Sequence, residues 1–183
     1  MRRLSQIVSS PLRLGCSLVG LTFLLYFAFS LVHVFGSARA MNHKTICATN
    51  VKQLMAGLLQ YSNDWDDHLP PAPQWATLSS VRGHQSSDAT VWHCPETSSA
   101  YSYAFNSALG SLSYSKLEAP SETVCLFEAD MTVWNAVGRV QQLAKDERHP
   151  WGLHYGFADG HVNHNRASRL SWLPVLLPVE KKP

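Results

Sequence analysis

Histidines gather near the end of the chain at a spacing that could serve a metal ion. Four of them lie within sixteen residues, together with one aspartate: His149, His154, Asp159, His161 and His164. Imidazole nitrogen and carboxylate oxygen are both ligands of Zn²⁺ in proteins, so this segment is one candidate metal site. No HExxH motif is present, and His161 and His164, an odd number of residues apart, would face opposite sides of a strand. The spacing therefore favours structural or surface histidines over a shared site.

A second group of candidate ligands is acidic. Asp64, Asp66 and Asp67 resemble the opening of a calcium-binding loop, although the glycine and the final glutamate of the EF-hand pattern are missing. The sequence favours a solvated acidic turn, with weak Ca²⁺ binding as the alternative and no other cofactor expected. The chain also has no G-x-S-x-G motif, no CxxC pair and no glycine-rich phosphate loop. These patterns predict a protein that is not an enzyme.

The cysteines favour one disulfide. Four cysteines stand at positions 16, 47, 94 and 125. Cys16 borders an apolar segment that separates it from the others, and Cys125 lies in a stretch typical of a buried strand, where a thiol behaves as a small apolar group. Cys47 and Cys94 remain. A bridge between them would close a long loop and stabilise the folded state by ~3–5 kcal/mol.

The elements that must position these residues begin with an apolar segment. Residues 14–36 contain no side chain that is ionised at neutral pH, and a helix of this length reaches the ~20 residues needed to cross ~30 Å of hydrocarbon. Arg2, Arg3 and Arg13 precede it, which places the N-terminus in the cytoplasm. We therefore predict a cytoplasmic basic leader over residues 1–13 and a single transmembrane helix over residues 14–36, with the rest of the chain exported.

The charge distribution agrees with a membrane anchor. The formal net charge is +2, but four arginines and no acidic residue precede residue 41, so the rest of the chain has 11 basic and 13 acidic side chains. A nucleic-acid-binding protein keeps its basic residues on the folded domain. We therefore expect the lipid bilayer, and not nucleic acid, to be a partner.

A cleavable signal peptide is the alternative to a retained anchor. Ala38-Arg39-Ala40 has the A-x-A form of a signal-peptidase site, and cleavage there would release a soluble protein that begins at Met41. The apolar segment is longer than the ~7–15 residues of a usual signal-peptide core. Its length favours retention.

An amphipathic helix is predicted to continue the membrane helix over residues 37–66. Its apolar residues recur at the helical spacing i, i+3, i+4, i+7 and i+8, as Val51, Leu54, Met55, Leu58 and Leu59. No proline interrupts the chain between Pro11 and Pro70, so the two helices can be continuous. The stripe predicts that one face of this helix is buried against a domain.

Residues 67–167 have the pattern of a β-rich domain. Short apolar stretches alternate there with turn-forming residues, which predicts strands at Ala89–His93, Tyr101–Phe105, Thr123–Phe127 and Tyr155–Phe157, and a short helix around Trp75–Val81. The tail over residues 168–183 is expected to pack on this domain or to lie along the membrane. The chain is thus predicted to be an α+β protein, with a long N-terminal helix packed on a small antiparallel sheet.

The strongest turn signal is Asp159-Gly160 between two extended stretches. It predicts a hairpin with a two-residue type I′ turn, in which both central residues have positive φ. That turn would pair Ala158 with His161, Phe157 with Val162 and Tyr155 with His164.

Several motifs in this order resemble a known family. His149 is followed after nine residues by Asp159-Gly160, which matches the pattern H-X9-DG, and Cys94-Pro95 matches a Cys-Pro element. The pattern C-x-x-N-[LV]-[KR]-Q-L is matched by Cys47, Asn50, Val51, Lys52, Gln53 and Leu54. The chain resembles bacterial pilin-like proteins of the type II secretion pseudopilin kind, and more narrowly those with a prepilin-type N-terminus and a C-terminal H-X9-DG motif. The resemblance covers roughly residues 38–165.

The resemblance implies a pilin-like fold and a role in assembly. Prepilins have a cleavage site of the form G-F-T-L-I-E before the apolar helix, whereas this chain reads G-C-S-L-V-G from Gly15 and has no glutamate over residues 14–36. The expectation is a membrane-anchored, non-enzymatic structural subunit of a type II secretion or pilus-like assembly. It would sit in the bacterial inner membrane with other pilin-like subunits or secretion proteins as partners.

Two other functions compete with this one. A membrane-tethered extracytoplasmic module could bind a ligand or wall polymer through its tryptophans and the loop 64–67. A metal-dependent hydrolase built on the late histidines is the less favoured alternative.

Overall fold

A single α-helix, α1 (Leu4–Asp64), runs from the apolar segment into the folded part of the chain. The computed structural model describes residues 4–79, 90–139, 148–149 and 152–165. The chain divides into two units, Met1–Ala40 and Met41–Pro183. The tail over residues 168–183, for which packing on the domain or along the membrane was expected, lies outside the described residues.

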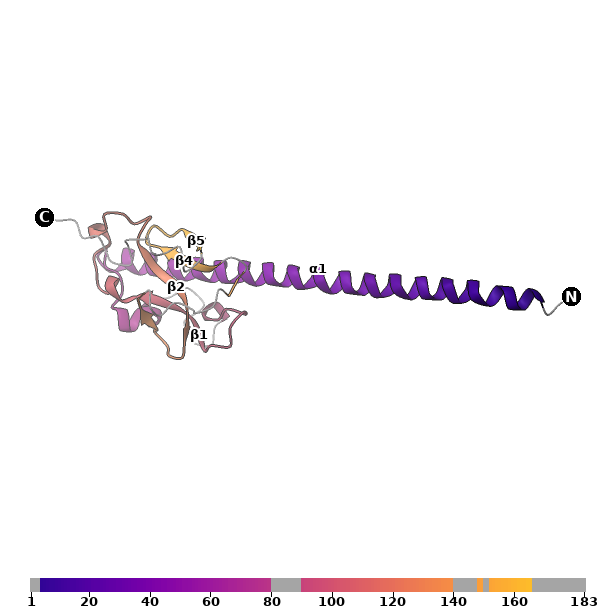
Figure 1. Ribbon diagram of the computed structural model, residues 1–183. Helices are drawn as coiled ribbons and strands as arrows, with labels where there is room; N and C mark the ends of the chain where they lie inside the picture. Colours follow the sequence, from indigo (N-terminus) through magenta and orange to yellow (C-terminus); the bar gives the residue numbers. More distant parts are fainter. Residues whose placement is uncertain (1–3, 80–89, 140–147, 150–151, 166–183) are drawn as a thin grey trace. The chain divides into compact units, whose positions relative to one another are not determined.

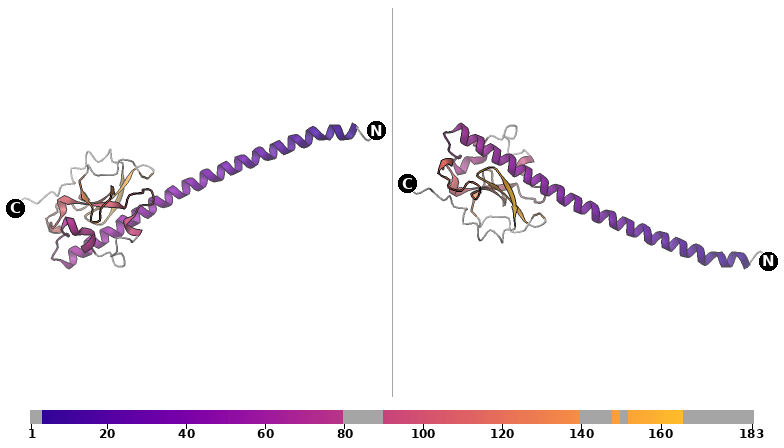
Figure 2. Two further views of the ribbon diagram at one scale, coloured as in Figure 1. Left: turned by 90° about the horizontal axis from the view of Figure 1, so that it is seen from below. Right: turned by 90° about the horizontal axis from the view of Figure 1, so that it is seen from above.

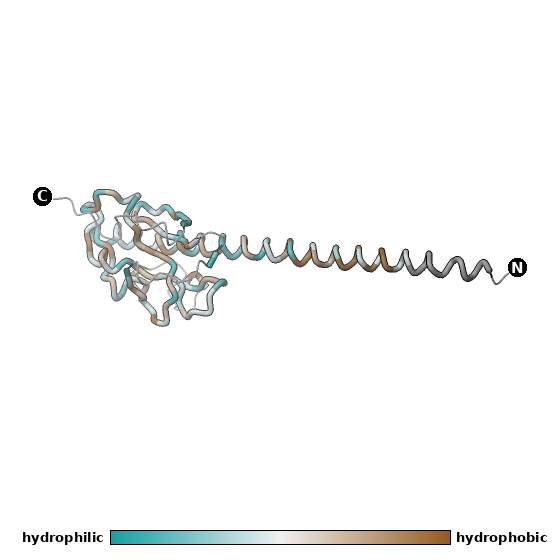
Figure 3. Tube along the Cα trace, in the orientation of Figure 1, coloured by the Kyte–Doolittle hydropathy of each residue, from teal (hydrophilic) through white to brown (hydrophobic). Residues whose placement is uncertain are grey.

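The first unit contains the apolar part of α1. From Ser17 onward this helix is long and apolar enough to cross a membrane, with a mean hydropathy of 2.1 over its most apolar window, none of which is buried. Large apolar side chains between Leu18 and Phe35 are exposed along it. In Figure 3 the trace of this helix has a brown stretch, the colour of hydrophobic residues. This length and composition are compatible with a membrane anchor.

In the second unit, α1 buries the predicted apolar stripe. Val51, Leu54, Met55 and Leu58 are fully buried, and Leu59 is half-buried at the edge of the stripe. The helix ends at Asp64, where Asp66 and Asp67 take positive φ angles of 47° and 63°. The amphipathic prediction is confirmed, and the helix stops two residues before the predicted boundary.

Five strands form one sheet in the order β3-β1-β2-β4-β5. They are β1 (Tyr101–Asn106), β2 (Val124–Met131), β3 (Val137–Gly138), β4 (Leu153–Phe157) and β5 (Val162–Asn165). The α+β prediction is confirmed, but the expectation of a purely antiparallel sheet is wrong. Three pairs are antiparallel, whereas β3 pairs with β1 in parallel. After β2 the chain crosses to the other side of β1. There it forms the edge strand β3, which runs in the same direction as β1.

Short helical turns connect these strands. They are η1 (Ala72–Gln74), α2 (Trp75–Leu78), η2 (Thr90–Trp92), η3 (Ser107–Leu109) and η4 (Tyr114–Lys116). The short helix expected near Trp75 is present. The strand expected at Ala89–His93 is instead the 3-10 turn η2, which buries Val91 and Trp92. A short apolar stretch does not distinguish these two conformations by its pattern alone.

The β4–β5 hairpin is present, but its predicted register is wrong by one residue. Gly156 pairs with Val162 and His154 with His164. A type I′ turn needs positive φ at both central residues, yet Gly160 has φ 89° and Asp159 does not share it. Residues 158–160 therefore form a three-residue loop that ends on a left-handed glycine, and the Phe157 N–H donates to the carbonyl of His161 at 2.9 Å.

The core lies between the sheet and the C-terminal part of α1. Figures 1 and 2 show the strands along this part of the helix. Leu126 of β2 belongs to the cluster that packs against α1, and its neighbour Phe127 belongs to a second cluster. This division follows from the alternation of side chains along a strand.

At Gly156 of β4 the helix and the sheet approach each other closely. A Cβ atom at this position would lie 2.5 Å from Cγ of Met55 and 3.0 Å from Cγ1 of Val51. The absence of a side chain therefore allows α1 to pack directly on the backbone of β4.

We expect Gly156→Val to destabilise the folded unit by ~1–3 kcal/mol, because the added methyl groups overpack the contact with Met55 and Val51. Thermal unfolding of the full-length chain in detergent measures this as a Tm that falls by several degrees. Asn163→Val, which places the same side chain at an exposed position of β5, is the control. An equal Tm for both variants would contradict the close contact.

Candidate functional site

Four buried side chains of metal-binding type meet on the helix-facing side of the sheet. They are Cys47 of α1, Cys94 after η2, Glu128 of β2 and His149 before β4, and we call them the buried cluster. Their ligand atoms all lie within 4.8 Å of one another. Within the part of the chain that the structure describes, this is the one group of three or more such residues. The fold thus unites residues from four separate segments.

Glu128 is the negative centre of the cluster. Its Oε1 lies 3.0 Å from Nε2 of His149 and 3.3 Å from Nδ1 of His154, and its Oε2 accepts the backbone N–H of His154 at 2.9 Å. Burial alone would raise the pKa of this carboxyl group, but the hydrogen bonds from the two histidines outweigh it and lower the pKa to about 2. Glu128 is therefore a buried carboxylate.

His149 lies between Glu128 and Cys94. Its Nε2 also lies 3.5 Å from Sγ of Cys94. Burial would lower the pKa of His149, yet the contacts with Cys94 and Glu128 raise it to about 9. The higher pKa favours the imidazolium form at neutral pH, with Nε2–H directed at Sγ of Cys94 and Oε1 of Glu128.

The two cysteines form an unequal pair. Hydrogen bonds from Cys47 and His149 lower the pKa of Cys94 to about 5 against the effect of burial, whereas the contact with Cys94 and burial raise the pKa of Cys47 far above its usual range. The hydroxyl of Tyr103 also contacts Cys47, and Asn50 donates to that hydroxyl at 3.3 Å. These contacts thus favour the thiolate form at Cys94 and the thiol form at Cys47.

The structure brings together the two cysteines that the sequence predicts as a pair. Cys47 and Cys94 are adjacent, and the structure has both as free thiols. Cys125 is fully buried in β2, as expected of a small apolar residue. The proximity of the pair is present, and the disulfide between them stays a prediction.

The late histidines do not form one site. His149 and His154 contact Glu128, whereas the ring of His161 faces Asp159 in the hairpin loop at 2.5 Å. The ring of His164 lies against that of His154, with the centroids 4.8 Å apart and the ring planes inclined by 52°. His149 therefore belongs to the buried cluster, His154 and His164 lie beside it, and His161 lies in the exposed hairpin loop.

The two halves of the H-X9-DG pattern have separate positions. His149 belongs to the buried cluster, while Asp159 accepts the N–H of His161 at 3.1 Å and Gly160 completes the hairpin loop. In the described residues no hydrogen bond joins His149 to Asp159. The motif therefore specifies one cluster residue and one turn.

One residue of the acidic loop 64–67, Asp67, has a structural role. Oδ2 of Asp67 accepts hydrogen bonds from the hydroxyl of Ser113 at 3.0 Å and from the N–H of Ser115 at 2.7 Å. Asp64 and Asp66 do not join it in a cluster of ligand atoms within the described residues. Calcium binding by this loop stays a prediction.

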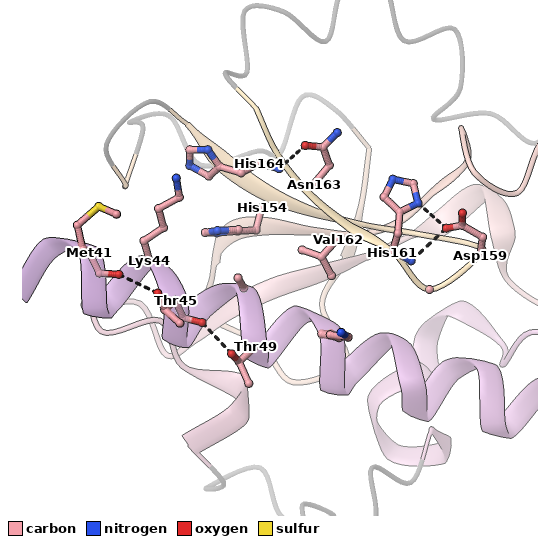
Figure 4. A pocket seen from close by; sticks show the side chains of 13 residues that line it. Met41, Lys44, Thr45, Thr49, His154, Asp159, His161, Val162, Asn163 and His164 are labelled. Atoms are coloured by element: carbon pink, nitrogen blue, oxygen red, sulfur yellow. Dashed lines mark hydrogen bonds and ion pairs between the residues drawn. The ribbon is translucent and has the colours of Figure 1, made fainter.

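A groove of about 810 Å³ lies between the Met41–Lys52 part of α1 and the β4–β5 hairpin. Figure 4 shows Lys44 and Thr45 on the helix side, and His154 and His164 on the strand side. Nε2 of His164 is buried without a hydrogen-bond partner in the described structure. Burial, with smaller contributions from the neighbouring His154 and Lys44, lowers the pKa of His164 to about 4.

Glu128 is the cluster residue that the sequence analysis missed. It interrupts the apolar stretch of β2, where Val124 to Ala129 are all buried. A carboxylate in a buried strand needs a partner. That signal was available in the sequence, but the partner's identity was not.

We expect the low pKa of His164 to make stability pH-dependent. The folded state holds the imidazole neutral down to pH about 4, whereas the unfolded chain protonates it near pH 6.5. The free energy of unfolding should therefore fall as the pH drops from about 6.5 towards 4. His164→Gln should reduce this fall, measured by chemical denaturation of the full chain in detergent at both ends of this range. An unchanged pH dependence in the variant would contradict the assignment.

Comparisons of this chain with protein-family models, with curated proteins and with solved structures find no match. The chemistry of its described residues is therefore what bears on function.

Proposed function

We propose that the protein is a membrane-anchored, non-enzymatic structural subunit of a type II secretion or pilus-like assembly, with a pilin-like fold. One observation carries the proposal. A single helix, α1, exposes apolar side chains from Leu18 to Phe35 and buries its stripe from Val51 to Leu58 in an α+β unit. The N-terminus would be cytoplasmic and the folded unit extracytoplasmic, at the bacterial inner membrane.

The exposed apolar part of α1 needs a cover. A contiguous apolar surface of this length is not stable in water, so lipid or other helices must surround it. In lipid, helices associate through close packing of their side chains. Such packing between copies or with related subunits is the mechanism of assembly that we propose.

The buried cluster supports a structural role more than a catalytic one. Cys47, Cys94, Glu128 and His149 are all closed off from solvent. A catalytic metal or nucleophile needs an open position for its substrate. The hydrolase alternative is therefore the weakest of the three functions.

Site-specific photo-crosslinking in native membranes tests assembly through α1. Crosslinkers at consecutive positions from Phe23 to Phe29 should give protein crosslinks that recur every three to four residues, because a packed helix presents one face to its partner. A crosslinker at Val133, which is exposed in the folded unit, is the control. Crosslinks to lipid alone would contradict the proposal.

The intact mass of the membrane-derived protein is the companion measurement. A chain that begins at Met1 or near Cys16 retains the apolar part of α1 and is compatible with anchoring, whereas a start at Met41 removes that part and contradicts anchoring.

A second candidate function is a membrane-tethered ligand-binding module, favoured by the groove between α1 and the β4–β5 hairpin. None of the described tryptophans lines it: Trp75 and Trp92 are core residues, Trp134 is half-buried against that core, and Trp65 is exposed and stacks on Tyr61. Trp151 and Trp172 lie outside the described residues.

If the groove binds wall-polymer fragments, such fragments should raise the Tm of the full chain in proportion to the logarithm of their concentration. Thr49→Trp, which fills the groove from an exposed position on α1, should abolish the shift. An unchanged Tm across the panel would count against this function.

A further inference from the structure

The composition of the buried cluster is that of a metal site. It offers two cysteine sulfurs, one imidazole nitrogen and one carboxylate oxygen, and these are the ligands that Zn²⁺ takes in proteins. Soft thiolates together with imidazole disfavour Mg²⁺ and Ca²⁺, which prefer oxygen ligands. We propose that the buried cluster binds a structural zinc ion through Cys47, Cys94, Glu128 and His149.

The distances within the cluster suit tetrahedral coordination. Zinc bonds of ~2.0–2.3 Å place neighbouring ligand atoms about 3.3–3.8 Å apart. Nε2 of His149 lies 3.5 Å from Sγ of Cys94 and 3.0 Å from Oε1 of Glu128, and no pair of ligand atoms is separated by more than 4.8 Å. The upper limit of 4.8 Å exceeds the tetrahedral separation by about 1 Å, so small side-chain movements would complete the tetrahedron.

The orientation of His149 identifies its coordinating atom. Nε2 faces both Cys94 and Glu128, whereas Nδ1 on the far side of the ring is buried without a hydrogen-bond partner in the described structure. The nitrogen that points into the cluster is therefore Nε2.

Neighbouring groups hold the other ligands in place. The backbone N–H of His154 fixes Oε2 of Glu128, and this leaves Oε1 directed at the cluster. The N–H of Cys94 donates to Oγ of Ser102 at 2.7 Å. Such outer hydrogen bonds orient the ligands of metal sites.

The burial of the site indicates that the metal would have a structural role. All four residues are buried, and sites with four protein ligands and no open position stabilise folds rather than perform catalysis. The ion would join α1, the segment after η2, the central strand β2 and the segment before β4. Because a site of this kind is not preformed in the unfolded chain, the free energy of metal binding contributes to folding.

A disulfide between Cys47 and Cys94 is the competing state. Both sulfurs would be used by the bridge, and neither would remain a thiolate ligand. The position of Glu128 and His149 around the pair favours the ion, because a disulfide gives no reason to bury a carboxylate and an imidazole beside it. The proposal does not depend on the proposed assembly function.

Zinc analysis of the full-length chain tests the site. The chain is purified from membranes in detergent without chelator and its metal content is measured by mass spectrometry, with about one zinc per chain expected. Replacing the metal with Co²⁺ should give the intense visible absorption of tetrahedral cobalt and a thiolate charge-transfer band. This spectrum reports the ligands in the unaltered protein, so it does not depend on whether a variant folds.

Matched variants locate the ion. Cys94→Ser and Glu128→Gln should each weaken zinc binding by more than the ~10–100-fold that loss of an outer hydrogen bond costs. Cys125→Ala, which removes a buried thiol outside the cluster, and His161→Ala, which removes an exposed histidine, should retain one zinc.

Three results would overturn the proposal. They are a Cys47–Cys94 crosslink in non-reduced peptides of the native protein, a chain without bound zinc whose cobalt spectrum lacks the thiolate band, and zinc that persists unchanged in Cys94→Ser and Glu128→Gln.

Discussion

The burial of one carboxylate in the central strand constrains much of the folded unit. Moving a charged group such as Glu128 out of water costs several kcal/mol unless other groups of the protein compensate for the lost solvation. The compensation comes from His149, from the ring and backbone of His154, and through His149 from the cysteines. These partners lie on other elements, so the charge requires β2, β4 and α1 to come together in one arrangement.

The helix α1 meets two different environments along its length. From Leu18 to Phe35 its apolar side chains are exposed on all sides, as lipid or helix partners require. From Cys47 to Leu58 only one stripe is apolar and buried, and the glycine at 156 lets that stripe pack on the backbone of β4. The change from one pattern to the other divides the helix between the two units.

The buried cluster lies where the buried part of α1 begins. Cys47 is the first fully buried side chain of α1 among those described. A metal ion or a disulfide at this position would fasten the helix to the sheet at the start of its buried part.

The sequence by itself determined the features that depend on local pattern. The apolar segment, the stripe from Val51 to Leu58 and the strands around residues 101 and 155 follow from periodicity and composition, which act within a few residues. Setting aside Cys16 and Cys125 likewise predicted that Cys47 and Cys94 are neighbours. A hairpin at Asp159-Gly160 was also foreseeable, since glycine supplies the positive φ that its loop needs.

Only the tertiary structure decided the register and the site. The choice between a two-residue turn and a three-residue loop changes every cross-strand pair, and it placed His164 opposite His154. The direction of β3, the 3-10 turn at Thr90–Trp92 and the meeting of Glu128 with His149 depend on contacts between distant segments. Such contacts are set by packing and by the need to satisfy a buried charge, and neither quantity can be read from the residues next to it in the chain.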